Sequence, residues 1–193
     1  MVLSMTIILG IDPGLNTTGY GVIDVSGGKV QLVEAGVVNS TAKELSQKIN
    51  EIYTGVVDVI ETLHPKVMAV EQLYTHYDRP TTAVLMAHAR GAIYLAAAQH
   101  EIPVVPFEAT KIKKIITGNG RASKDQIQRA IQLELHLKSV PEPPDVADAL
   151  AVALCQFYHG KINVKSGKPH SASNQAGQGI YFDTPPFRDT VVR

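Results

Sequence analysis

Short apolar runs separated by turn residues dominate the first 107 residues of the chain. Thr6–Asp12 and Val67–Glu71 are almost continuously apolar, and each ends in a single acid. A run of this kind is typical of a strand that is buried on both faces of a sheet. Thr18–Val25 and Lys29–Val38 follow the first run after short connections, which predicts an antiparallel meander. Ile102–Phe107 is the fifth predicted strand.

Helical periodicity fills the intervals between the later strands. From Glu44 to His64, apolar residues recur at spacings of three and four, so an amphipathic helix is expected to connect two parallel strands. Pro80–His100 is apolar nearly all round and is expected to be buried on more than one side, either in the core or in a subunit interface. Further helices are predicted at Thr110–Thr117, from the Ser123 cap to Leu137, and from Pro144 to near His159.

This order of elements predicts an α/β fold. Strands one to three form an antiparallel unit of a mixed five-stranded sheet, strands four and five run parallel to strand one, and helices cover both faces. The chain has 193 residues, enough for one domain, which we place at residues 5–160. Residues 161–193 are mostly Ser, Gly, Asn, Gln and Lys before a few late aromatics, so a disordered C-terminal tail is expected.

The composition limits the cellular compartments in which the protein is expected. An apolar content of 45% fits a globular protein, and no stretch of 18 apolar residues is present, so no membrane partner is expected. The single cysteine, Cys155, lies in an apolar helix and indicates a reducing compartment. With no evident secretory signal, we expect a cytoplasmic protein.

Four carboxylates stand in otherwise apolar sequence. Asp12 and Glu71 end buried strands, and Asp145 and Asp148 are the only charges in the last helix as far as His159, on one face because they are three residues apart. Strand four beside strand one would bring Glu71 next to Asp12. Each acid alone could equally be a structural cap or a paired charge. Together they predict a site for hard divalent cations such as Mg²⁺, which take oxygen ligands, and two ions would suit phosphoryl displacement.

Cations gather in one segment although the net charge is zero. Residues 110–130 hold six of the 18 lysines and arginines but only one acid. This segment is either a solvated helix face or a surface for a phosphate backbone. Tyr74, in the polar loop after Glu71, either packs back on the domain or stacks on an unpaired base. The candidate DNA-binding residues are Tyr74, Lys111, Lys113, Lys114, Arg121, Lys124 and Arg129.

These residues resemble the RuvC family of Holliday-junction resolvases, within the ribonuclease-H-like superfamily. The resemblance extends in order from about Thr6 to Tyr158, and all four acids have the family spacing. The matching motifs are Gly10–Gly14, Gly19–Gly21, Val70–Gln72 and Asp145–Ala151.

The resemblance implies a homodimeric, structure-selective endonuclease of recombination and DNA repair. Such an enzyme nicks two strands of a four-way junction symmetrically and leaves 5′-phosphate ends. By motif, Asp12, Glu71, Asp145 and Asp148 would hold two Mg²⁺ ions per subunit, with Mn²⁺ able to substitute, and Lys124 would be catalytic. A branch-migration motor of the RuvA and RuvB type is the implied partner.

Two smaller correspondences and two alternatives complete the interpretation. Lys113 matches a second basic position of the family, and Tyr74 stands where the family usually has phenylalanine. One alternative is a ribonuclease-H-like nucleotide-binding protein, but this would need a second related domain. The other is a non-catalytic junction-binding protein, against which the presence of all four acids argues.

Overall fold

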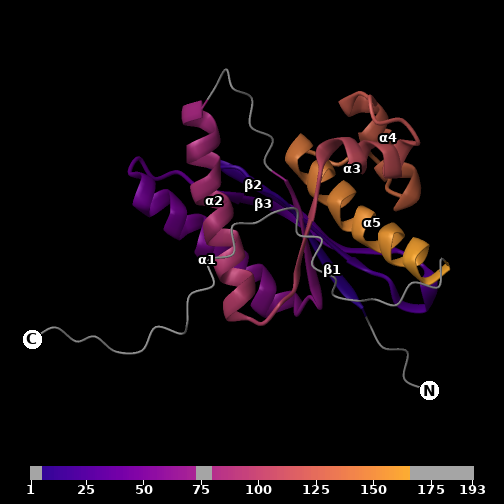
Figure 1. Ribbon diagram of the computed structural model, residues 1–193, viewed down its shortest axis with the longest axis horizontal. Coiled ribbons are helices and arrows are strands. Elements are labelled where there is room, and N and C mark those ends of the chain that lie inside the picture. The colour runs from indigo at the N-terminus through magenta and orange to yellow at the C-terminus, as the bar shows by residue number, and fades with distance from the viewer. Residues whose placement is uncertain (1–5, 73–79, 166–193) are drawn as a thin grey trace, which may run out of the picture.

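The computed structural model describes residues 6–72 and 80–165 of the chain, and it forms a mixed five-stranded sheet with helices on both faces (Figure 1). The strand order is β3-β2-β1-β4-β5. β1 pairs antiparallel with β2 and parallel with β4, and β4 pairs parallel with β5, which confirms the predicted topology. The strands are β1 Ile7–Asp12, β2 Thr17–Asp24, β3 Gln31–Asn39, β4 Val67–Glu71 and β5 Val104–Phe107.

Each face of the sheet has its own hydrophobic core. One core joins the sheet to α1 and α2, and the other joins it to α3, α4 and α5 (Figure 1). The alternation of side chains along β1 explains the division, because Leu9 and Ile11 enter the first core and Ile8 enters the second. The helices are α1 Leu45–Leu63, α2 Pro80–Gln99, α3 Ala109–Thr117, α4 Lys124–Glu134 and α5 Pro144–Lys165, and Ser26–Gly28 is a 3₁₀ turn.

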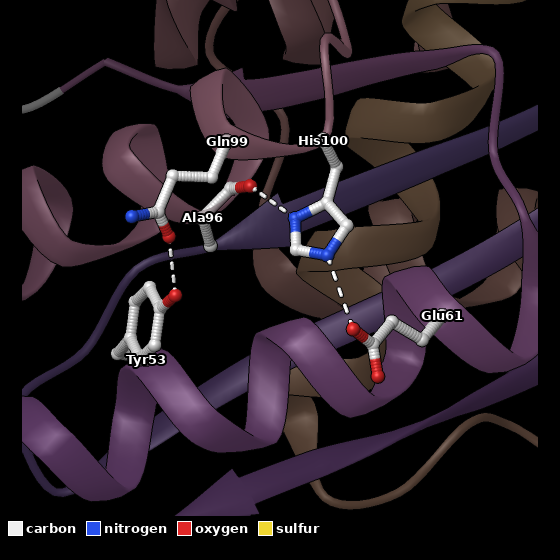
Figure 2. A network of polar contacts seen from close by, with 5 residues as sticks. All are labelled: Tyr53, Glu61, Ala96, Gln99 and His100. Carbon is white, nitrogen blue, oxygen red and sulfur yellow. Dashed lines mark hydrogen bonds and ion pairs between the residues drawn. The ribbon is translucent and has the colours of Figure 1, made fainter.

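Polar contacts join α1 to α2 at one end of the pair (Figure 2). The Tyr53 hydroxyl donates to Gln99 Oε1. The His100 ring lies 2.8 Å from the Ala96 carbonyl oxygen through Nδ1 and 3.3 Å from Glu61 through Nε2. These contacts cross between the helices near the start of β4, whereas the acid-bearing end of β4 is at Glu71. They therefore hold α1 and α2 together at a place that is remote from the predicted site.

α5 lies unusually close to the centre of the sheet. A Cβ atom on Gly10 would lie 2.2 Å from the Ala149 carbonyl oxygen, and one on Gly19 would lie 2.1 Å from the Asp145 carbonyl oxygen. Both distances are too short for any real Cβ atom. Glycine at these two positions therefore allows the helix backbone to contact β1 and β2 directly.

Several boundaries differ from the sequence predictions by one to six residues, among them the start of β5, which is Val104 and not Ile102. α4 ends at Glu134, before the predicted Leu137, because His136 adopts a left-handed φ of 52° that no helix can continue. β3 begins at Gln31 and not at the predicted Lys29, because Gln31 pairs with Asp24, the last residue of β2. α5 continues to Lys165 beyond the predicted end near His159, since Gly160 does not take the positive φ of a helix-terminating glycine.

Within the single chain, α2 is not the central core helix that one alternative predicted, and its burial in a subunit interface stays a prediction. Ala89, Ile93 and Ala97 are buried, but Val84 is 57% exposed and Leu95 is 52% exposed. Gly91 has nothing within 4 Å of a built Cβ among the described residues. Among the described residues, one face of α2 is thus largely apolar and exposed to solvent.

Candidate active site

Two acids of the predicted site lie side by side at the ends of neighbouring strands. β1 and β4 are parallel, and Ile11 is the register partner of Val70. Asp12 and Glu71, the next residue on each strand, consequently reach the same sheet edge. Carboxyl ends of strands are the usual place for sites in α/β proteins.

The N-terminal part of α5 brings the other two acids to this edge. Asp145 occupies the first turn, and its backbone closely approaches Gly19, the register partner of Asp12, which places Asp145 at the end of β1. Asp148 follows three residues later on the same helix face. Its charge acts on both Asp12 and Glu71, so three separate elements contribute to one acidic cluster.

The electrostatics confirm that these acids crowd one another. Burial is the largest influence on Asp12, followed by the charges of Glu71, Asp148 and Asp145, and together they raise its pKa to about 8. Burial and the charge of Asp148 also raise the pKa of Glu71. Without a cation between them, the cluster therefore favours a protonated Asp12 at neutral pH.

The donor set fits hard divalent cations, although it is not a preformed coordination shell. All four groups are carboxylates, the ligands that Mg²⁺ and Mn²⁺ accept, and cations would relieve the repulsion that raises the pKa of Asp12. Among the residues that the structure describes, no group of three acids or histidines is already spaced to bind one ion.

Two lysines of the basic segment reach the acidic cluster. Lys124, at the start of α4, places Nζ 3.3 Å from Asp148 Oδ2. This neighbouring carboxylate raises the pKa of Lys124, and the lysine in turn lowers that of Asp12. Lys113 on α3 acts on Glu71, whose pKa it lowers. The Ser123 capping box, in which Ser123 and Gln126 exchange hydrogen bonds, fixes the helix start that carries Lys124.

The remaining basic residues of this segment do not act on the pKa of Asp12 or Glu71. Lys111 lies over the Phe107 ring, with Nζ 5.3 Å from the ring centroid. Lys114, Arg121 and Arg129 are exposed on α3, α4 and their connection. Tyr74 lies outside the described residues.

Arg90 on α2 was missed by the sequence analysis. It donates hydrogen bonds to the Glu71 carbonyl oxygen and to the Tyr94 hydroxyl, and its charge lowers the pKa of Glu71. A usable signal was present, because Arg90 is the only charged residue of Pro80–Gln99 when His is neutral. An isolated cation in an apolar helix demands a partner for the same reason as an isolated acid.

Comparison with known proteins identifies the family. The family model described as "Crossover junction endodeoxyribonuclease RuvC" matches residues 8–156 and so includes all four acids. The chain belongs to the RuvC family. A RuvC from Rhodopirellula baltica is 54% identical over 156 residues, which cover 80% of this chain and 88% of the relative.

Solved RuvC structures share the fold. Thermus thermophilus RuvC superimposes with a TM-score of 0.74 at 31% sequence identity and covers 81% of this chain and 96% of its own. T. thermophilus RuvC in complex with a Holliday junction substrate gives a TM-score of 0.72 at 28% identity, over 84% of this chain and 97% of the other. The chain is accordingly a crossover junction endodeoxyribonuclease with the ribonuclease-H-like fold.

No helix among the described residues has the length and apolar character that crossing a membrane requires.

Proposed function

We propose that this RuvC-family chain resolves four-way DNA junctions by metal-dependent nicking of two symmetric strands. The products carry 5′-phosphate ends that a ligase can join. The observation that carries the proposal is the convergence of Asp12, Glu71, Asp145 and Asp148 from β1, β4 and α5, with Lys124 beside them. The metals are divalent cations, two Mg²⁺ per subunit, which Mn²⁺ can replace.

Asp12, Glu71, Asp145 and Asp148 would hold the cations at the ends of β1 and β4 and the start of α5. Bound divalent cations supply Lewis-acid stabilisation of the charge that develops on the phosphate. Lys124 is the catalytic cation of the chain itself: its ammonium group lies 3.3 Å from Asp148, and its side chain is 70% exposed, so it can turn toward a phosphate oxygen. Its raised pKa keeps it charged at neutral pH.

DNA binding is assigned to the surface that α3 and α4 build around the acids. Exposed lysines and arginines contact phosphates without reading sequence, which suits recognition of a branched shape. Tyr74 would stack on a base at the crossover. The binding residues are Tyr74, Lys111, Lys113, Lys114, Arg121, Lys124 and Arg129.

A homodimer provides the second active site that symmetric nicking requires. The open face of α2 supplies the surface: Val84, Ala87, Gly91, Leu95 and Ala98 are exposed at spacings of three and four, forming one apolar stripe of small and large side chains. A stripe of this kind pairs with its own copy across a two-fold axis. We place the dimer in the cytoplasm, working with a branch-migration motor of the RuvA and RuvB type.

The deciding experiment is incubation of the full chain with an end-labelled four-way junction, with and without Mg²⁺. We expect paired nicks at symmetric positions and products that ligase seals, with no cleavage of linear duplex of the same sequence. Cleavage in chelator would contradict metal dependence. Binding of the junction without any nick, in Mg²⁺ or Mn²⁺, would instead indicate a non-catalytic junction-binding protein.

A further inference from the structure

Among the described residues, Arg90 has two hydrogen-bond partners and one ring contact, none of them an acidic side chain. One arm of its guanidinium donates to the Glu71 carbonyl oxygen. The other arm donates to the Tyr94 hydroxyl at 2.6 Å, and the guanidinium carbon lies 4.9 Å from the centroid of the Tyr94 ring. Tyr94 is one helical turn after Arg90, so it holds the arginine in a single orientation.

The bond to Glu71 acts on a particular peptide group. The Glu71 carbonyl and the Gln72 amide belong to the same planar peptide. Arg90 binds the carbonyl from α2, while the Gln72 amide donates to the Phe107 carbonyl oxygen of β5 at 2.8 Å. That peptide is therefore clamped between two elements at the point where β4 ends, and the clamp fixes the backbone that carries the Glu71 carboxylate.

Arginine suits this position better than lysine. Its planar fork points two donors in defined directions and stacks on an aromatic ring, whereas the ammonium group of lysine is a single compact charge on a flexible stem. A lone cation in an apolar helix is costly unless its donors are used. Here the donors are used on the backbone of a predicted cation ligand.

We propose that Arg90, oriented by Tyr94, is a positioning residue that holds Glu71 in place to bind a divalent cation together with Asp12. The inference rests on the proposed metal-dependent nuclease function. It also connects the active site to α2, the helix assigned to the dimer. Partners that orient metal ligands typically change metal affinity or activity by about 10–100-fold when removed.

The test compares Arg90→Gln and Arg90→Lys with the wild-type full chain in two measurements. The first is the rise in melting temperature as Mg²⁺ is added, which needs no DNA. The second is the single-turnover cleavage rate on a four-way junction across a Mg²⁺ series. We expect Arg90→Gln to need about tenfold or more Mg²⁺ for half of the effect in both, with unchanged junction affinity. Arg90→Lys should recover part of the loss.

Two tyrosine variants extend the test: Tyr94→Phe is a second test variant, and Tyr53→Phe is its matched control. Tyr94→Phe removes the hydroxyl that orients Arg90 and should shift the Mg²⁺ dependence in the same direction but less. Tyr53→Phe removes a hydroxyl from the same helix pair, far along it at Gln99, and should leave the dependence unchanged (Figure 2). If Arg90→Gln does not fold, the comparison of Tyr94→Phe with Tyr53→Phe still tests the proposal.

The outcomes separate the inference from the function. Wild-type Mg²⁺ dependence in both Arg90→Gln and Tyr94→Phe overturns the positioning role. A loss confined to junction affinity also overturns it and makes Arg90 a DNA contact. If the wild-type chain is stabilised by Mg²⁺ but cleaves no junction, the proposed function fails while the melting shifts still test Arg90.

Discussion

At the scale of single residues, Asp12 links the fold to the pH of the solution. Its pKa is about 8 in the folded chain, against 3.8 for an ordinary aspartate. Between these values the folded state binds a proton that the unfolded state has lost. The free energy of unfolding therefore has a contribution from Asp12 that is complete below pH 4 and is lost as the pH rises through about 8.

This direction of the pH dependence of stability predicts the behaviour of Asp12→Asn. In chelator, the melting temperature of the wild type should fall more steeply between about pH 4 and 8 than that of the variant, because asparagine has no proton to lose. Cleavage should be abolished while junction binding remains, since binding depends on basic contacts to phosphates. If the melting temperatures of the wild type and the variant fall with the same slope as the pH rises, then the crowding of Asp12 does not affect stability.

The two lysines near the acids should differ in what they change. Lys124 pairs with Asp148 and influences Asp12, whereas Lys113 influences Glu71. We expect Lys124→Ala to lower the cleavage rate at saturating enzyme. Lys113→Ala should mainly weaken junction binding and reduce the salt slope by about one. Identical losses of rate and affinity in both variants would contradict this division.

At the scale of elements, the sequence was most informative where one charge interrupts an apolar run. β4 was predicted with both of its boundaries, and its parallel neighbour followed from the crossover helix, which together placed Glu71 beside Asp12. Helix ends were less predictable because backbone conformation at single residues decides them, as at His136. Arg90 stood out in the sequence as the only charge of Pro80–Gln99, but its partner is a backbone carbonyl, which no sequence pattern identifies.

The close packing of α5 on the sheet is testable at Gly19. In Gly19→Ala the new Cβ would lie 2.1 Å from the Asp145 carbonyl oxygen, so the first turn of α5 must move away from β2. Overpacking of this kind costs about 1–3 kcal/mol. We expect a lower melting temperature and a larger loss of cleavage than of junction binding, because the moving turn carries Asp145 and leads directly into the turn that carries Asp148.

A second glycine of the chain serves as the control for Gly19. Gly160 lies within α5, and no atom of the described part of the chain comes within 4 Å of a Cβ built on it. Gly160→Ala should stabilise the helix by up to about 1 kcal/mol and leave cleavage unchanged. Unimpaired cleavage by Gly19→Ala would show that the acids tolerate displacement of α5.

At the scale of the whole molecule, an all-round apolar helix left two interpretations open. The structure shows that the inner face of α2 packs on α1 and the sheet, while Val84 and Leu95 face outward. Sequence periodicity could not separate these faces, because small and large apolar residues alternate around the whole helix. Only the packing of the other elements reveals which apolar side remains uncovered.

The uncovered stripe predicts a variant that separates dimer formation from chemistry. Leu95→Asp places a charge in the middle of the stripe, where a partner copy would have to bury it unpaired. We expect the chain to stay folded, because Leu95 is already half exposed, but to sediment as a monomer. Paired nicking of one junction should become rare, because two sites are no longer delivered together, while single nicks persist at high enzyme concentration.

Leu133→Asp is the control, since Leu133 on α4 is 75% exposed and lies outside the stripe. If Leu95→Asp remains dimeric with paired nicks, then another surface joins the subunits, and the apolar face of α2 needs a different partner.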